Sequence, residues 1–127
     1  MSKKKVRFRN FEGISFSVFE RIRYESKRRK LDFKITIEDV AKKFKEQNGI
    51  CNLSGRILKL KRTLKDTIAN ASLDRIDSTK GYLPDNIQWV DKEINKLKSS
   101  LPQEKFLQLC KEISKNLTSS SNTMTPN

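Results

Sequence analysis

Apolar residues recur at three- and four-residue steps between positions 15 and 30, the spacing of an amphipathic helix. Phe16, Phe19 and Ile22 supply the apolar stripe, and Ser15 or Ser17 is available as the N-cap. Arginine and lysine residues occupy the opposite side. This segment therefore predicts a helix with one buried face and one charged face.

A second helical pattern follows Thr36, with Asp39 in the position of a capping-box partner and Asn48-Gly49 as a typical helix end. Its apolar stripe consists of Ile37, Val40, Ala41 and Phe44. Residues 50–58 are expected to form a short strand, a turn and another short strand. Residues 59–66 then predict a strongly basic loop.

The period of the pattern changes after position 70. Residues 71–77 alternate between apolar and polar positions, as a half-buried strand does, and residues 87–90 form a second short strand. Residues 78–86 between them are dense in turn-forming residues and predict a loop. Residues 91–99 return to helical spacing. The residues expected to face inward on this helix are Ile94 and Leu97.

These elements predict one α+β domain over residues 13–117. Its centre is the strand–strand–helix unit of residues 71–99, and two N-terminal helices and a C-terminal helix are expected to pack around it. Residues 1–12 are interpreted as a basic flexible arm.

The C-terminal helix is expected to begin at Pro102. Its apolar stripe of Phe106, Leu109 and Ile113 is predicted to enter the core. Residues 118–127 are rich in Ser, Thr and Asn without apolar periodicity, and they predict a disordered tail.

Net charge is the first indication of function. The chain has 28 Lys and Arg against 15 Asp and Glu, a formal charge of +13. An excess of this size favours a polyanionic partner, of which double-stranded DNA is the leading candidate, although a solvated basic face is the plain alternative. The candidate contacts are Lys4, Arg7, Arg28, Arg29, Lys61, Arg62, Lys80, Lys92 and Lys98.

Several classes of protein are disfavoured. No stretch approaches the roughly 18 apolar residues that span a bilayer, and the basic N-terminus lacks the apolar run of a secretory signal. We therefore expect a cytoplasmic protein that does not contact membranes. Two cysteines, Cys51 and Cys110, and no His exclude a Cys/His zinc site, and both thiols are expected to be buried and reduced.

Three polar side chains of the 71–99 unit form a candidate metal site. Asp74 leaves the first strand, and Asp91 and Asn95, four residues apart, are expected to share one face of the helix. Their oxygens suit one hard divalent cation, Mg²⁺ or Mn²⁺. From spacing alone, the alternative is that these side chains simply face solvent on the surface of the helix.

Four short motifs follow one another here: Ser72-Leu73-Asp74-Arg75-Ile76-Asp77, Gly81-Tyr82, Asn86-Ile87-Gln88-Trp89-Val90, and Asn95 with Lys98. With Gly49 to Gly55 upstream and Phe106 to Cys110 downstream, they resemble a branch of the HNH (His-Me finger) endonucleases common in phage and mobile elements. The resemblance covers residues 14–113. It implies a ββα-metal fold, with one cation between hairpin and helix and the helix lying against the DNA minor groove.

Carried over by position, the resemblance makes Asp74 and Asn95 metal ligands, with Asp91 as a further ligand. Asn86 is implied to tie the loop to the hairpin and to position the site. Arg75 stands where most HNH enzymes carry the His that activates water. Because Arg stays protonated, we expect it to hold a nonbridging phosphate oxygen instead.

The identity of the general base stays open. Relatives often carry His at the position of Asp91, and this chain has none. Asp77, Tyr82 and metal-bound hydroxide are the candidates, and Asp77 also has the plain reading of a brace for the loop.

The sequence therefore predicts a metal-dependent DNA endonuclease that nicks or cuts duplex DNA, in the nucleoid or in a phage-infected host cell. The alternative is a DNA-binding protein on the same scaffold that does not cleave. A small RNA-binding protein is a third interpretation, without an RNP-like aromatic signature to favour it. A monomer and a homodimer are both compatible with the sequence.

Overall fold

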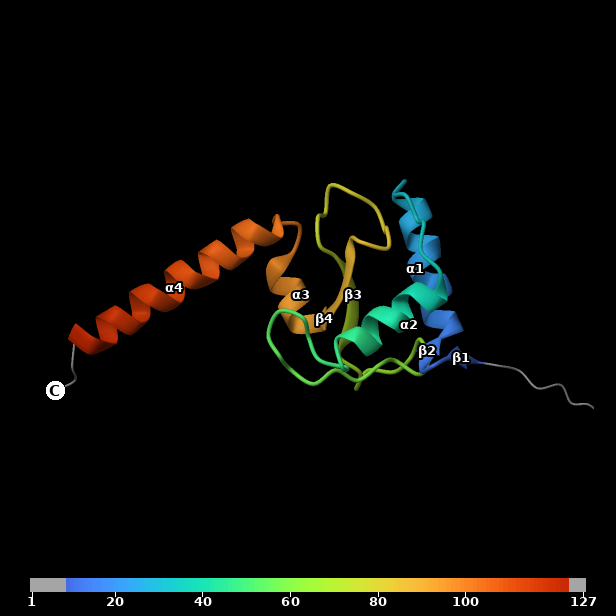
Figure 1. Cartoon of the computed structure of the whole chain (residues 1–127), viewed down its shortest axis with the longest axis horizontal. Helices are drawn as coiled ribbons and strands as arrows, with labels where there is room; N and C mark the ends of the chain where they lie inside the picture. The colour runs from blue at the N-terminus through green and yellow to red at the C-terminus, as the bar shows by residue number, and fades with distance from the viewer. Residues whose placement is uncertain (1–8, 124–127) are drawn as a thin grey trace, which may run out of the picture.

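The computed structural model describes residues 9–123, and side chains through residue 119, as a small α+β fold of four helices and two antiparallel two-stranded sheets (Figure 1). The predicted contacts Lys4 and Arg7 lie outside the described residues. The elements are β1 (Asn10–Phe11), β2 (Ile14–Ser15), α1 (Phe16–Arg28), α2 (Ile37–Glu46), β3 (Ala71–Arg75), β4 (Ile87–Asp91), α3 (Lys92–Lys98) and α4 (Gln103–Thr123).

A tight hairpin precedes the first helix. Glu12 and Gly13 connect β1 to β2 with φ angles of 49° and 91°, the left-handed pair that favours a two-residue hairpin turn. Residues 10–12 therefore belong to the fold and not to a flexible arm as predicted. The Ser15 hydroxyl accepts from the Val18 amide at 3.2 Å, so the predicted N-cap of α1 is confirmed.

The predicted capping box of α2 is also confirmed. The Asp39 amide donates to the Thr36 hydroxyl at 3.1 Å, and the Thr36 amide donates to the Asp39 carboxylate at 2.8 Å. The chain leaves this helix through left-handed Asn48 and Gly49, as predicted. The buried side chains are Ile37, Val40 and Ala41.

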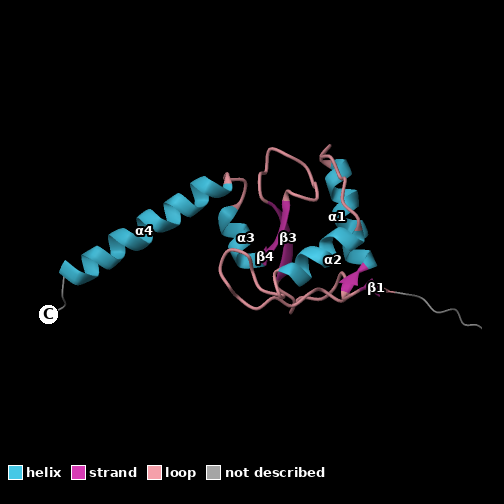
Figure 2. Cartoon of the chain, viewed as in Figure 1, coloured by secondary structure: helices cyan, strands magenta, loops and turns pink. Residues whose placement is uncertain are grey.

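The β3–β4 hairpin lies at the centre of the molecule, between α3 and the two N-terminal helices (Figure 2). Trp89 of β4 packs edge-on against Phe44 of α2, with ring centroids 5.7 Å apart, and its indole N–H donates to the Val40 carbonyl at 2.9 Å. Trp89 is 3% exposed. Trp89 is therefore an anchor of the hydrophobic core.

The loops that flank the hairpin are held by close backbone contacts. Gly81 lies against the backbone of Asp32, where an added Cβ would meet the Asp32 nitrogen at 2.7 Å. Phe33 and Tyr82 form an isolated parallel bridge beside this contact. In the 50–58 segment, the two predicted strands are reduced to a single bridge between Ile50 and Ile57.

The third helix differs from its prediction at both ends. Asp91 is the last residue of β4 and the N-cap of α3, so it does not share a helical face with Asn95. Leu97, predicted to point inward, is 65% exposed, and its neighbour Lys98 is fully buried instead.

The C-terminal helix α4 projects away from the rest of the fold (Figure 1), contrary to the predicted packing. Ile113 is 60% exposed, and Phe106 and Leu109 are only half-buried, because the hairpin is already covered by α2 and α3. Helix α4 runs to Thr123, so residues 118–123 are helical and not disordered as predicted. None of the helices within residues 9–123 is long and apolar enough to cross a membrane.

Candidate functional site

A buried ion pair joins Asp74 of β3 to Lys98 of α3. The Lys98 ammonium donates to Asp74 Oδ2 at 2.7 Å and to the carbonyl of Arg75 at 2.9 Å. The Lys98 side chain is 0% exposed and that of Asp74 is 9% exposed. Lys98 was predicted to contact DNA, and that prediction is wrong for this structure because the side chain faces the hairpin.

Gln88 completes the surroundings of Asp74. Its Nε2 donates to Asp74 Oδ2 at 2.9 Å and to Gln103 Oε1 at 2.6 Å, and its Oε1 accepts from Asn52 at 2.8 Å. Gln88 is 1% exposed. No role for Gln88 was predicted from the sequence, because its position directly across the sheet from Asp74 depends on the strand register.

The three predicted metal ligands do not converge. Asp74 pairs across the sheet with Gln88, and Asp91 pairs with Ala71. Because side chains alternate along a strand, these two carboxylates leave opposite faces of the hairpin. Asn95 lies on the Asp74 side, where its Nδ2 donates to Ser72 Oγ at 2.9 Å.

Asp91 is fully engaged by protein groups. Its Oδ1 accepts from Arg56 at 3.2 Å and from the Glu93 amide at 2.8 Å, and its Oδ2 accepts from Asn70 at 2.9 Å. Burial raises the pKa of Asp91, but the hydrogen bonds from Asn70 and the α3 amides, together with Arg56, outweigh burial and hold the pKa below its usual value. Asp91 therefore caps α3 and stays ionised at neutral pH.

A cleft of about 720 Å³ opens beside these residues. Ser72, Asp91 and Asn95 are among its lining residues, and Asp74 is not. No group of three or more Asp, Glu, Cys or His side chains within residues 9–123 is placed to hold a metal ion. Because Asp74 does not line this cleft with Asp91 and Asn95, the predicted set of three ligands does not fit a single Mg²⁺ or Mn²⁺, and we assign no reaction step to such an ion.

Asn86 ties the loop to the hairpin as the resemblance implied. Its Oδ1 accepts from the Asp77 amide at 2.8 Å, and its Nδ2 donates to the carbonyls of Asp77 and Gly81 at 3.0 and 2.9 Å. The side chain is 5% exposed. Asn86 therefore holds both halves of the 76–86 loop with one amide group.

Arg75 and Asp77 both serve the loop. The Arg75 guanidinium donates to the carbonyls of Ser78 and Lys80 at 2.8 and 2.7 Å. The Asp77 carboxylate accepts from the amide and the hydroxyl of Thr79. These two bonds lower the pKa of Asp77, which makes it a weaker base. The interpretation of Asp77 as a brace for the loop thus agrees with its contacts.

Tyr82, the other side chain considered as a base, lies under the Arg75 guanidinium at 5.7 Å from the ring centroid. Burial raises the pKa of the Tyr82 phenol above its usual value. The phenol is therefore protonated at neutral pH, which does not suit a general base.

The other predicted DNA contacts that the structure describes lie at the surface. Arg29, Arg62, Lys80 and Lys92 are exposed, and Lys61 is half-buried. Arg28 is exposed but is paired with Glu25 at 2.7 Å. Among the cysteines, Cys51 is buried as predicted, whereas Cys110 is exposed on α4, contrary to the prediction.

No family model, curated protein or solved structure matches this chain.

Proposed function

We propose that this chain binds double-stranded DNA through a cationic surface, defined here by Lys59, Arg62, Lys65, Lys92 and Lys96. Three of these residues lie in the loop before β3, and Lys92 and Lys96 lie on α3. All five are exposed. None of them forms an ion pair within residues 9–123. Exposed cations without ion-pair partners, clustered on neighbouring segments of a strongly basic protein, are the electrostatic footprint of a nucleic-acid partner.

The loop and α3 are held side by side by two bonds. The Lys92 ammonium donates to the Thr67 carbonyl at 3.5 Å, and the Lys92 amide donates to the Asn70 carbonyl at 2.8 Å. These bonds fix the backbone segments that carry the five cations relative to each other. A surface that is already ordered pays less entropy when it meets the phosphates of a rigid duplex.

The contrast between paired and unpaired cations supports this assignment and provides its control. Arg23 on α1 is paired with Glu20 at 2.8 Å, whereas the Arg62 guanidinium forms no ion pair within residues 9–123. Duplex affinity is expected to fall steeply with salt, because each neutralised phosphate releases condensed counterions. Removing a phosphate contact is expected to lower the salt slope by about one.

The test is fluorescence anisotropy of a labelled duplex at several salt concentrations. We expect Arg62→Gln and Lys65→Gln each to weaken binding of all duplex sequences and to lower the salt slope by about one. Arg23→Gln removes the same charge and is expected to leave the slope unchanged. Equal slopes for all three variants would contradict the proposal. Tighter binding to structured RNA at matched salt would assign the surface to RNA.

Metal-dependent cleavage of DNA is a second candidate function. It is favoured by the order of antiparallel hairpin, Asn86-braced loop and helix, and by the cleft that Asp91 and Asn95 line. The chain's own contribution would be a braced loop and an ordered cationic surface that holds the duplex beside the cleft.

Nicking of supercoiled plasmid in Mg²⁺ or Mn²⁺ separates the two functions. Because the three predicted ligands do not converge, we expect DNA binding without metal-dependent nicking. Nicking by the wild type that is lost in both Asp74→Asn and Asn95→Ala, with duplex binding retained, would establish cleavage and overturn the expectation. Lys105→Met, at an exposed lysine of α4 outside the cationic surface, is the control.

A further inference from the structure

The loop that supplies three cations of the proposed surface also exposes two large aliphatic side chains. Ile68 is 77% exposed and Leu64 is 47% exposed. Single exposed aliphatic residues are ordinary on protein surfaces. Here, however, both lie among Lys59, Lys61, Arg62 and Lys65, in a segment of residues 59–69 whose formal charge is four Lys or Arg minus one Asp, or +3.

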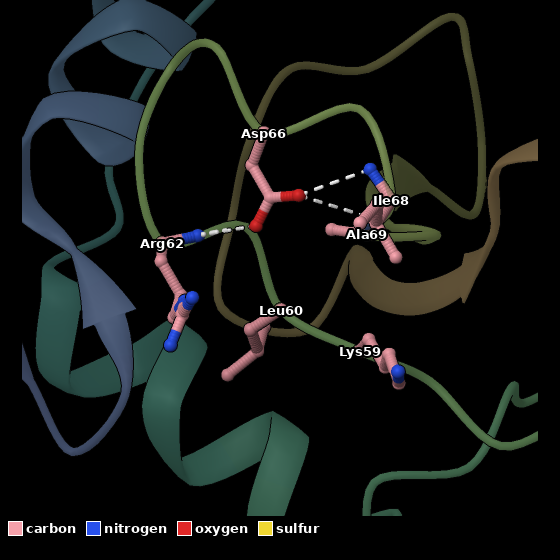
Figure 3. A pocket seen from close by; sticks show the side chains of 6 residues that line it. All are labelled: Lys59, Leu60, Arg62, Asp66, Ile68 and Ala69. Atoms are coloured by element: carbon pink, nitrogen blue, oxygen red, sulfur yellow. Dashed lines mark hydrogen bonds between the residues drawn. The ribbon is translucent and has the colours of Figure 1, made fainter.

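The loop that exposes Ile68 and Leu64 is held in place by hydrogen bonds. Asp66 accepts from the backbone amides of Arg62, Ile68 and Ala69 at 3.2, 3.0 and 3.1 Å (Figure 3). Hydrogen bonds from these amides, that of Arg62 first, lower the pKa of Asp66 and keep it ionised. The carboxylate thus organises the loop around itself.

The same loop is anchored to the body on its other side. Ala69 is buried, and Leu60 packs against the core cluster. Ile68 lies next to this buried anchor and lines an open cavity of about 470 Å³ together with Lys59 and Arg62 (Figure 3). The chain therefore packs Ala69 and Leu60 of this loop inward and leaves Ile68 outside, on a fixed backbone.

We propose that the 59–69 loop is a wedge that enters the minor groove of duplex DNA, with Ile68 inserted between base pairs and Leu64 supporting it. The proposal rests on the DNA binding proposed above. Architectural DNA-binding proteins insert Ile, Leu or Phe at a base step in this way while neighbouring cations hold the phosphates. A β-branched side chain on a braced backbone has few rotamers to lose on insertion.

Charge complementarity favours DNA over an apolar protein partner as the occupant. An apolar protein surface would have to desolvate Lys59, Arg62 and Lys65 around the two aliphatic residues without compensating charge. In a DNA groove, phosphates flank the bases on both sides and accept these cations, while the base step accepts the side chain. Asp66 stays ionised, but the four cations of residues 59–69 outnumber it, so the net charge of the loop toward DNA remains +3.

Wedge insertion predicts a preference for flexible DNA. A pyrimidine–purine step such as TA unstacks more easily than an A-tract, so a duplex with a central TA step is expected to bind more tightly. It is also expected to bend by about 20–90°, the range produced by such wedges. The bend is measured by energy transfer between dyes at the duplex ends, and unstacking by fluorescence of 2-aminopurine placed at the step.

The decisive variant is Ile68→Ala, which keeps the backbone amide that binds Asp66. It is expected to abolish the bend and the 2-aminopurine signal, and to weaken binding to the TA duplex by at least about tenfold, because the substitution removes three carbon atoms that insertion would bury. The salt slope is expected to stay unchanged, because the cations remain. Ile113→Ala is the matched control, since Ile113 is 60% exposed on α4.

The outcomes distinguish the two proposals. Binding of wild type without bending or unstacking, or an Ile68→Ala variant that bends DNA like wild type, would overturn the wedge and leave DNA binding intact. Absence of duplex binding by the wild type would overturn both. Bending lost in Ile68→Ala but retained in Ile113→Ala supports the wedge.

Discussion

Replacing Lys98 with Met is expected to destabilise the fold by about 3–5 kcal/mol, the usual effect of removing one partner of a buried ion pair. The change leaves the Asp74 carboxylate buried without its cation, and it removes the donor shared by the carbonyls of Arg75 and Ile76. Urea unfolding followed by Trp89 fluorescence measures the free energy directly. A loss below about 1 kcal/mol, the range of most surface substitutions, would contradict the assignment of this pair as a central contact.

Two further variants separate charge from packing at the same place. Lys96→Met changes an exposed lysine of the same helix and is expected to alter stability by less than about 0.5 kcal/mol. The double variant Asp74→Asn with Lys98→Met removes both charges. It is expected to recover part of the stability lost in Lys98→Met, because no uncompensated charge then remains.

The second large effect is expected from Asn86→Ala. Alanine removes three hydrogen bonds and leaves the Asp77 amide and the Gly81 carbonyl without these partners, whereas the Asp77 carbonyl still accepts from the Lys80 amide at 3.1 Å. With about 1–3 kcal/mol for each buried group left unsatisfied, and partial access of water to the loop, we expect a loss of about 2–4 kcal/mol. Urea unfolding gives this value, and amide hydrogen exchange of Asp77 is expected to accelerate markedly.

The neighbouring residue provides the control for this variant. Asp85→Ala alters an exposed side chain in the same loop and is expected to change neither stability nor exchange of the Asp77 amide. If Asn86→Ala left Asp77 exchange at its wild-type rate, the loop would be held by other contacts, such as the Arg75 bonds to Ser78 and Lys80.

The sequence was sufficient to predict the helices and strands whose ends are set by residues close to them in the chain. Thr36 and Asp39 form a capping box because the two residues are three apart, whatever the rest of the fold does. Alternation likewise predicted β3 and β4, and turn residues predicted the loop between them. The role of Asn86 came from a resemblance and agrees with its contacts.

Predictions that depended on the direction of a single side chain were less successful. Lys98 was expected at the surface because lysine is rarely buried, and Leu97 was expected inside because it is apolar. A rotation of one residue along α3 exchanges their environments. That rotation follows from the cap at Asp91, which is held by Arg56 and Asn70 from distant parts of the chain.

The sequence by itself determined the helices α1 and α2, the β3–β4 hairpin and the excess of positive charge, because these depend on composition and on contacts within a few residues. Only the tertiary structure decided which polar groups meet. Asp74 and Asp91 lie on opposite faces of one hairpin, and Lys98 joins Asp74 from another element. The physical reason is that strand register and helix rotation are set by long-range packing, and a shift of one residue in either changes every pairing.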